Sequence, residues 1–382
     1  MLFLALKEVI TIKKILFGIT SLTLGGAERV LVDISNKLSE KYDITIFSIY
    51  DNGELKNDLN KNVKFKALYN CRYYELTKLQ KMWIPIKILL FSKIIYNKKI
   101  KQNYDTEIAF LEGPITRLFS TKNKDVHKIA WIHNDIEKVF GNDLKSKIKK
   151  YIDKKIYKKY NDLVFVSQDN MEKFQNIYND LNTENMHVIY NYIDKDLVIK
   201  KSNYNIKVEF DYNSINFLTV CRLVKQKAID RFIRVHSKLI NRGLKHKVYI
   251  IGDGPEKENL QKLIKQENVE DTFILLGKKE NPYPYIKNAN YFCLLSEFEG
   301  YGMVLEEAKI LNKPIIITNT AARECIENYP KALILENSED EIYDGLYKLL
   351  NDNDDKIFNN TQTSTEYDNT EKLQKIIELV GD

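Results

Sequence analysis

A glycine-rich turn carries the residues whose types are best suited to chemistry. Glu299 stands directly before Gly300 and Gly302, and Glu307 follows about one turn into a helix that we expect to begin near Met303. Carboxylates in these two places can accept hydrogen bonds from two vicinal hydroxyl pairs, one on a sugar and one on a ribose. The free backbone N–H groups at the start of that helix would meet a phosphate between the two sugars.

The same segment has a simpler explanation, which is a helix with charged residues on its exposed side. This explanation accounts well for Glu306, but it accounts poorly for Glu299, which glycines bracket. We therefore expect the turn to bind a phosphorylated ligand. Besides the two carboxylates, the residues expected to contact it are Gly300, Tyr301, Gly302, Met303 and Val304.

Two cations follow the apolar run 215–220, which we expect to be a strand. Arg222 and Lys227 lie just past the carboxyl end of that run. Cations in such a place suit a diphosphate leaving group, because they neutralise charge that grows as the bond to it breaks. Surface lysines are common, so these two residues alone do not identify a site.

Two further strand-to-helix turns contain paired glycines. Gly25 and Gly26 occupy one, and Gly252 and Gly254 occupy the other. Glycines let the backbone approach a ligand, and free N–H groups at a helix start favour an anion. A tight structural turn is an equally simple explanation. Lys257 occupies the third position of a dinucleotide-binding Gly-x-Gly-x-x-Gly, which disfavours that kind of site.

These turns need a framework that brings strand ends together. Apolar runs and helical patterns alternate along the chain, which is typical of βα units and parallel sheets. We predict an α/β fold with two doubly wound, Rossmann-like domains facing a central cleft, because such sheets bind ligands at the carboxyl ends of their strands. The predicted boundaries are a first domain over 1–194, a linker over 195–213, a second domain over 214–369, and a final helix in 370–382 that can pack back towards the first domain.

The composition excludes several classes of protein. The chain has 382 residues and a net charge of +6, and its four cysteines stand far apart without a Cys-x-x-Cys pair. This disfavours a zinc site, a redox motif or a disulfide scaffold, and it indicates a reducing compartment. The first six residues are apolar but too few for a signal segment. We therefore expect a cytoplasmic chain.

The charge is unevenly distributed. Residues 61–160 contain 24 Lys and Arg against 9 Asp and Glu, whereas the rest of the chain contains 35 against 44. This predicts an anionic partner, and since no nucleic-acid-binding module accompanies the charge, an acidic membrane surface is favoured. The apolar stretch 82–96 is either an interfacial helix with lysines at its rim or a core helix with a basic end. Both interpretations stay open. Pro85 and Lys87 interrupt the apolar stretch, which argues against a membrane-spanning helix.

In combination, the motifs resemble those of glycosyltransferase family 4. Glu299 and Glu307 keep the family's spacing in the frame Glu-Gly-Tyr-Gly, and Arg222 and Lys227 keep theirs. Residues 25–29, Gly-Gly-Ala-Glu-Arg, are similar to the family's amino-terminal loop. The remaining matching pieces, in order, are Gly252-Asp253-Gly254-Pro255-Glu256, Asn281-Pro282-Tyr283 and Asn319-Thr320-Ala321-Ala322-Arg323-Glu324.

This resemblance implies a GT-B fold and a glycosyltransferase that uses a nucleotide-sugar, retains the anomeric configuration and needs no bound metal or other cofactor. It implies that Arg222 and Lys227 hold the diphosphate, Glu299 the donor sugar and Glu307 the nucleotide ribose. His133, at a predicted strand end, matches the family's histidine facing the reacting sugar. The predicted catalytic residues are His133, Glu299, Arg222 and Lys227, and the predicted donor-binding residues are Gly25, Gly26, Gly252, Gly254, Gly300, Tyr301, Gly302, Met303, Val304 and Glu307.

The chain also departs from the family pattern. Cys221 and Ala228 replace glycines around the cationic pair, and Ala321 and Ala322 replace a Gly-Gly. None of these changes removes a charged group, so we predict an active enzyme. Two Asp-x-Asp pairs, of the type that a metal-dependent transferase would use, fall in predicted loops, and we interpret them as solvated turns; they are Asp194 with Asp196 and Asp352 with Asp354.

The expected reaction moves a hexose or an N-acetylhexosamine from a UDP-sugar to a glycan, linked to a polyprenyl lipid, in capsule, lipopolysaccharide or other surface-polysaccharide biosynthesis. The first domain would be the acceptor side, and its basic 61–160 region would hold the protein on the inner face of the cell membrane. Two alternatives stay open. One is a nucleotide-sugar epimerase on the same fold, and the other is a non-catalytic partner that recruits another transferase to the membrane.

Overall fold

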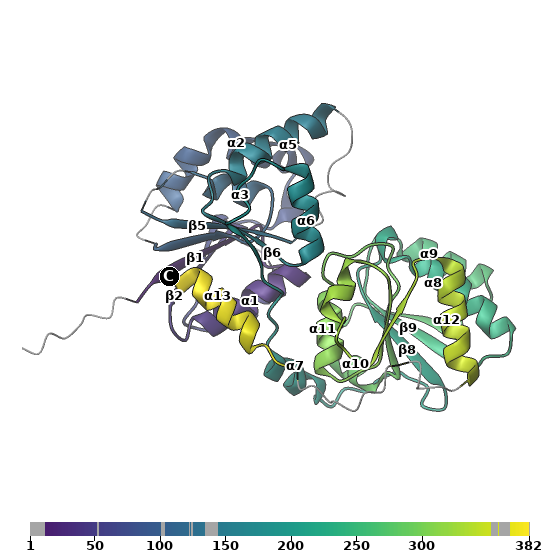
Figure 1. Ribbon diagram of the computed structural model, residues 1–382. Helices are drawn as coiled ribbons and strands as arrows, with labels where there is room; N and C mark the ends of the chain where they lie inside the picture. The colour runs from purple at the N-terminus through teal and green to yellow at the C-terminus, as the bar shows by residue number, and fades with distance from the viewer. Residues whose placement is uncertain are drawn as a thin grey trace, which may run out of the picture. The chain divides into compact units, whose positions relative to one another are not determined.

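The chain forms two compact units, residues 1–192 with 370–382 and residues 193–369 (Figure 1). The computed structural model describes residues 12–51, 53–100, 104–121, 123, 125–133, 144–352, 358 and 367–381. The expectation of no signal segment, which falls on the first residues, therefore lies outside the described residues.

A seven-stranded parallel sheet forms the centre of the first unit, in the order β3-β2-β1-β4-β5-β6-β7. The strands are β1 Lys14–Ile19, β2 Asp43–Tyr50, β3 Lys64–Tyr69, β4 Thr106–Ala109, β5 His127–Ile132, β6 Asp162–Phe165 and β7 Met186–Val188. The helices are α1 Gly26–Leu38, α2 Lys78–Lys99, α3 Pro114–Phe119, α5 Leu144–Tyr157, α6 Gln168–Ile177 and α13 Thr370–Gly381, with short 3-10 turns η1 Glu54–Asp58 and η2 Tyr73–Glu75.

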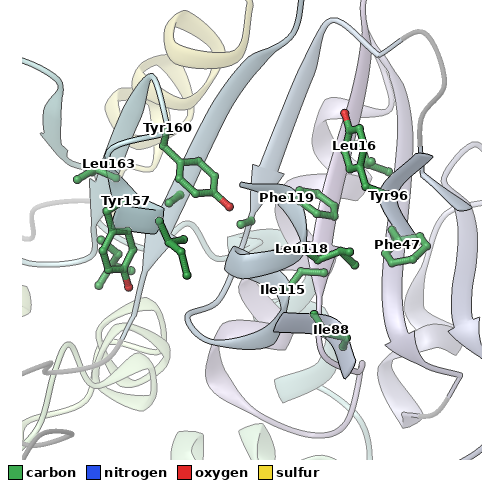
Figure 2. Packing of buried hydrophobic residues seen from close by; sticks show 14 of the residues in the cluster. Leu16, Phe47, Ile88, Tyr96, Ile115, Leu118, Phe119, Tyr157, Tyr160 and Leu163 are labelled. Carbon is green, nitrogen blue, oxygen red and sulfur yellow. The ribbon is translucent and has the colours of Figure 1, made fainter. Parts of the chain in front are cut away.

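The core on one face of this sheet is made by α2, α3 and α5, which lie on the side opposite α1 and α13 (Figure 1). Figure 2 shows Ile88 and Tyr96 of α2 with Leu118 and Phe119 of α3 and Tyr157 of α5 in this core. These side chains are buried, and their apolar area is the main source of stability for this layer. One side of the helix that contains residues 84–96 therefore packs in the core.

The carboxy-terminal helix α13 belongs to the first unit. Lys13 Nζ donates a hydrogen bond to the carbonyl of Gly381, and Thr106 Oγ1 donates one of 3.4 Å to the carbonyl of Val380. Ile376 and Val380 of α13 are buried. The last helix of the chain thus packs on the unit formed by the beginning of the chain.

A six-stranded parallel sheet forms the centre of the second unit, in the order β10-β9-β8-β11-β12-β13. The strands are β8 Ile215–Val220, β9 His246–Ile251, β10 Phe273–Gly277, β11 Tyr291–Leu294, β12 Ile315–Thr318 and β13 Ala332–Leu335. The helices are α7 Lys195–Ser202, α8 Ile229–Asn241, α9 Lys257–Gln266, α10 Tyr283–Asn288, α11 Met303–Ile310 and α12 Glu339–Asp352, with 3-10 turns η3 Lys225–Lys227 and η4 Ala321–Cys325.

Elements of both units differ from the sequence prediction, among them strand β13, which was not predicted. The stretch predicted as a linker, 195–213, begins with helix α7, which belongs to the second unit and contacts α10 and α11. The weak periodicity hid this helix because it has only eight residues. Strand β3 was not predicted, because its lysines interrupt the apolar pattern; it lies at the edge of its sheet, where lysines are tolerated.

None of the helices within the described ranges combines the length and apolar content that crossing a lipid bilayer requires.

Candidate functional site

The predicted site residues of the second unit follow β8, β9 and β11, which are neighbours in the sheet. The strand order reverses between β8 and β11, since β9 lies on one side of β8 and β11 on the other. In sheets of this kind ligands bind beyond the carboxyl ends of the strands at the reversal point. The turn after β8 carries Arg222 and Lys227, and the turn after β11 carries Glu299.

Lys227 and Glu299 form an ion pair between Nζ and Oε1. Lys227 is the last residue of η3, and Glu299 lies in the turn before α11. The two side chains are 17% and 8% exposed, so their charges interact in a partly desolvated place. The structure thus brings together two residues that the sequence assigned to one ligand.

Ser296 holds the same carboxylate from the buried side. Its Oγ donates a hydrogen bond of 2.6 Å to Glu299 Oε1. Ser296 is fully buried, and its carbonyl accepts a 2.6 Å hydrogen bond from Thr318 Oγ1. Ser296 was not among the residues predicted from the sequence; a hydroxyl residue two positions after a buried strand and before a glycine-rich turn is the signal that could have identified it.

Main-chain contacts fix the two turns against each other. Gln226 Nε2 donates a 2.8 Å hydrogen bond to the carbonyl of Phe298. The amide of Glu297 donates one of 2.9 Å to the carbonyl of Gln226. These two contacts join the residue directly before Lys227 to the two residues before Glu299, and they therefore hold the two turns together.

Arg222 lies in the same turn as Lys227 with an exposed side chain. Its guanidinium forms no ion pair in the part of the chain that the structure describes. An exposed, uncompensated guanidinium is well suited to bind phosphate oxygens through its fork of N–H donors.

The glycines after β9 make room for the turn that carries Arg222. A Cβ atom on Gly252 would lie 1.8 Å from the carbonyl oxygen of Cys221, and one on Gly254 would lie 2.3 Å from that of Leu223. The amide of Leu223 donates a 3.0 Å hydrogen bond to the carbonyl of Asp253. Close packing of the two turns is sufficient reason for both glycines, and their contact with a ligand stays a prediction.

The two glutamates of α11 are both buried. Glu307 is 9% exposed, and its Oε1 accepts a 3.1 Å hydrogen bond from the Tyr283 hydroxyl. Glu306 is 1% exposed, so its expected place on the exposed side of the helix is wrong. It accepts a hydrogen bond from the Tyr301 hydroxyl, and its Oε2 lies 3.4 Å from Lys309 Nζ. Glu306 therefore stabilises the inner side of the turn.

The start of α11 has the geometry of an anion site. Gly302 has φ +74°, which glycine adopts without a Cβ penalty. No side chain caps the first turn of the helix that begins at Met303, so its first N–H groups, including that of Val304, are not bound by a capping side chain. Since the Tyr301 side chain is buried against Glu306, only its backbone can contribute to such a site.

In the first unit, His133 follows β5 with a neutral imidazole. Burial lowers the pKa of His133 to about 3. Its Nε2 is buried and has no hydrogen-bond partner within the described part of the chain. The ring packs against Phe110 at 4.7 Å between centroids, and its backbone amide donates a 2.7 Å hydrogen bond to Glu112 Oε1. The imidazole therefore presents a polar atom that the described residues around it do not bind.

Gly25 and Gly26 form the start of α1, with Gly25 as its N-cap. The carboxylate of Glu28 lies against this turn, because a Cβ on Gly25 would be 2.2 Å from Glu28 Oε2. Burial raises the pKa of Glu28, although a backbone hydrogen bond acts in the opposite direction. The helix start thus already has a carboxylate beside it, and a phosphate approaching Gly26 would meet that side chain.

The prediction that the Asp-x-Asp pairs fall in loops is wrong for three of their residues, since Asp194 and Asp196 stand at the start of α7 and Asp352 is the last residue of α12. Asp194 caps α7, since its Oδ1 accepts a 2.9 Å hydrogen bond from the amide of Leu197. Asp354 lies outside the described residues. No group of three or more His, Cys, Asp or Glu side chains among the described residues is arranged to hold a metal ion.

A family model described as "Glycosyl transferases group 1" matches residues 200–365. The chain is also similar to curated proteins over most of its length. It is 27% identical over 342 residues to an N-acetylgalactosamine-N,N'-diacetylbacillosaminyl-diphospho-undecaprenol 4-alpha-N-acetylgalactosaminyltransferase of Campylobacter jejuni, covering 87% of this chain and 89% of that protein. It is 24% identical to a poly(ribitol-phosphate) alpha-N-acetylglucosaminyltransferase of Staphylococcus aureus, over 68% of this chain and 51% of that protein.

Solved structures share the fold. HepE of Anabaena in complex with UDP and glucose has a TM-score of 0.74 at 16% identity, covering 97% of this chain and 99% of its own. TarM of S. aureus has a TM-score of 0.73 at 16% identity, covering 98% of this chain and 99% of its own. The two parallel Rossmann-like sheets are those of a GT-B fold, as the sequence predicted.

Proposed function

Since the chain belongs to the glycosyl transferases group 1 family, we propose that it moves a hexose or an N-acetylhexosamine from a UDP-sugar to a hydroxyl of a lipid-linked glycan. The observation that carries this proposal is the Lys227–Glu299 ion pair beside Arg222. It gathers groups suited to a diphosphate and to sugar hydroxyls at one sheet edge. UDP is supported by the solved structure of HepE, which holds UDP and glucose.

In the proposed reaction, Arg222 and Lys227 bind the diphosphate and stabilise the charge that grows on it. The acceptor hydroxyl attacks the anomeric carbon on the face from which UDP departs, and its proton goes to the leaving diphosphate. This order of bond making and breaking retains the anomeric configuration and needs no nucleophile from the protein. Cations that contact the leaving group stabilise mainly the transition state, because the negative charge is largest there, and this lowers the activation free energy.

The donor is held on both sides of its diphosphate. Glu299 accepts hydrogen bonds from sugar hydroxyls, and Glu307 accepts them from the ribose. The uncapped start of α11 supports a phosphate between them, because its first N–H groups face outward along the helix axis. The Tyr283 hydroxyl, 3.1 Å from Glu307 Oε1, orients the ribose-binding carboxylate.

The first unit contributes His133 and the Gly25–Gly26 turn in this proposal. The support for His133 is its buried Nε2, which has no partner among the described residues, together with its neutral state. A neutral imidazole can form a hydrogen bond with a sugar hydroxyl without adding charge to the site. Gly26 would approach the donor phosphate once the Glu28 carboxylate beside Gly25 moves aside.

The proposed class of acceptor is inferred from the name of a similar protein. The Campylobacter jejuni protein is named for an acceptor on diphospho-undecaprenol, which supports a polyprenyl-linked glycan and a role in surface-polysaccharide assembly. Such an acceptor lies in a membrane. We place the protein in the cytoplasm, on the inner face of the cell membrane, where the excess of Lys and Arg in residues 61–160 would favour acidic lipid.

The test is nucleotide release from a panel of UDP- and GDP-sugars, with a bacterial membrane extract as acceptor and EDTA present. We expect release from one UDP-sugar, dependent on the extract, and at least ~10²-fold slower release for Glu299→Ala. Glu299→Gln keeps the shape of the side chain and separates the role of charge from that of packing.

Glu297→Ala is the matched control, because Glu297 lies in the same turn with an exposed side chain. We expect it to keep most of the turnover. Donor conversion without any acceptor would favour an epimerase instead. Release from no donor, with or without EDTA, would contradict the proposed transfer, and release that occurs only without EDTA would contradict metal independence.

A further inference from the structure

Helix α2, Lys78–Lys99, is apolar on both of its sides. Ile84, Ile88 and Tyr96 face the core of the first unit, where Figure 2 shows the last two. The opposite side is exposed although its residues are just as large and apolar. The exposed hydrophobic residues of α2 are Leu79, Met82, Trp83, Ile86, Leu89, Leu90, Phe91 and Ile94.

These residues form a continuous outward stripe. Leu79, Trp83 and Leu90 recur at spacings of four and seven, which places them on one side of the helix before its kink at Phe91; Ile94 is exposed after that kink. Trp83 is 58% exposed and Leu90 67% exposed. A soluble helix normally exposes polar residues opposite its core side, so a second apolar side indicates a second apolar environment.

The charge around this stripe has one sign. Helix α2 contains six lysines and no acidic residue. Within the described part of the chain none of these lysines forms an ion pair; Lys81 lies over the ring of Tyr73 and Lys87 over that of Tyr69. Lysines can extend along an apolar stripe and place their ammonium groups at lipid headgroups while the stripe enters the acyl region.

A second helix extends the same kind of surface. Helix α5 also has six lysines, with one acidic residue, and it exposes Ile148 and Tyr151. Both α2 and α5 contact α3, and all three pack on one face of the first sheet (Figure 1). The apolar stripe of α2 and the lysines of α5 therefore belong to one side of the first unit.

We propose that α2 lies in the plane of an anionic membrane, with Trp83 and Leu90 inserted among the lipid chains and the lysines of α2 and α5 at the headgroups. This deepens the proposed function: it rests on the membrane setting given there, but not on the transfer chemistry. Acidic lipid fits better than a protein partner, because the surface combines a long apolar stripe with positive charge and almost no acidic residues.

The two tryptophans of the chain make the insertion directly measurable. Trp131 is 1% exposed in the core, whereas Trp83 is exposed on α2. In the full chain mixed with phosphatidylcholine–phosphatidylglycerol vesicles, we expect a blue shift of the emission and quenching by bromine on the acyl chains. The Trp83→Phe variant keeps the apolar stripe and Trp131, so its emission should show neither effect although it still binds vesicles.

Affinity for the same vesicles is the second measurement. The double variant Trp83→Ser/Leu90→Ser should bind at least about tenfold more weakly, because each residue loses a large buried apolar side chain. Exchanging Lys93 for glutamine should weaken binding by about fivefold, and 0.5 M salt should weaken the wild type further. Tyr212→Ser, which removes a 69% exposed ring from the second unit, is the matched control and should change nothing.

The readouts separate this inference from the proposed reaction. UDP binding in solution should be unchanged in Trp83→Ser/Leu90→Ser, which also shows that the variant is folded, and vesicle binding should be unchanged in Glu299→Ala. Vesicles that leave Trp83 emission and its bromine quenching unaltered would overturn the insertion of α2. An emission shift that follows protein concentration instead of lipid would also overturn it and would make the stripe a surface for a second copy of the chain.

Discussion

Lys227 Nζ binds Glu299 Oε1, although 72 positions separate the two residues in the sequence. The same carboxylate oxygen accepts the hydroxyl of buried Ser296. In the proposed reaction a donor diphosphate would compete with Glu299 for Lys227, while Ser296 keeps the carboxylate in place. The ion pair orders the two side chains, and diphosphate binding as proposed would give up this one internal pair.

Replacing Lys227 by alanine should lower turnover by ~10²-fold or more, since the loss of one group that stabilises transition-state charge has effects of this size. The measurement is initial rate at saturating donor. Lys225→Ala removes an exposed lysine from the same 3-10 turn and should leave the rate within a few-fold of the wild type. Equal losses in both variants would show that the turn, and not the charge of Lys227, matters.

Tyr283→Phe should weaken UDP binding by about 3- to 10-fold, because the variant loses the hydrogen bond that orients Glu307. Calorimetric titration with UDP gives this value. Tyr329→Phe removes a hydroxyl that donates to the carbonyl of Lys313 in the same unit, and it should bind UDP like the wild type. Unchanged affinity in Tyr283→Phe would argue against a role of this pair in nucleotide binding.

Gly252→Ala should destabilise the second unit by more than about 3 kcal/mol, because its Cβ would overlap the carbonyl of Cys221 as well as meet a strained φ. Gly243 also has a positive φ but no atom within 4 Å of its Cβ position. Gly243→Ala should therefore cost only about 1–2 kcal/mol. Urea unfolding compares the two, and similar costs would mean that the turns do not depend on this close packing.

Ala228→Gly should raise the stability of the second unit by about 0.5–1 kcal/mol. Ala228 has φ +48° at the start of α8, a conformation that costs an L-residue about 1–2 kcal/mol, from which the greater freedom of glycine in the unfolded chain subtracts part. The residue noted in the sequence as a departure from the family glycine is thus strained. A lower urea midpoint for the variant would refute this account.

Acidification should destabilise the second unit through two buried histidines. Burial lowers the pKa of His236 to about 2 and that of His246 to about 4, and their rings share a 2.8 Å hydrogen bond. In the unfolded chain imidazoles have a pKa near 6.5, so below that pH the unfolded state binds more protons than the folded one. Stability should be full above about pH 6.5 and fall as the pH drops towards 4, by up to about 1.4 kcal/mol per pH unit for each histidine.

Urea unfolding between pH 7.5 and 4.5 measures this dependence. The His236→Gln variant has one buried imidazole fewer, so its stability should fall less steeply with acid, whatever its absolute stability. Parallel curves for the two proteins would exclude His236 as a cause.

Much of the fold follows from local sequence patterns. Runs such as 215–220 form buried parallel strands because both of their faces are mostly apolar, and the glycine-rich turns fall where strands end. The same patterns failed where tertiary contacts override them. Strand β3 is stabilised by pairing with β2 despite its lysines, and α7 is a short helix held by α10 and α11.

Residue chemistry and spacing by themselves determined the family resemblance, the fold class and the choice of Lys227, Glu299 and Glu307 as site residues. Only the tertiary structure decided that Lys227 pairs with Glu299, that Ser296 supports the pair and that Glu306 is buried. It also decided that α2 has a core side and an exposed apolar side. The physical reason is the distance along the chain over which each effect acts. Propensity and periodicity depend on a few neighbouring residues, whereas the contacts decided by the tertiary structure depend on which elements the fold places next to each other.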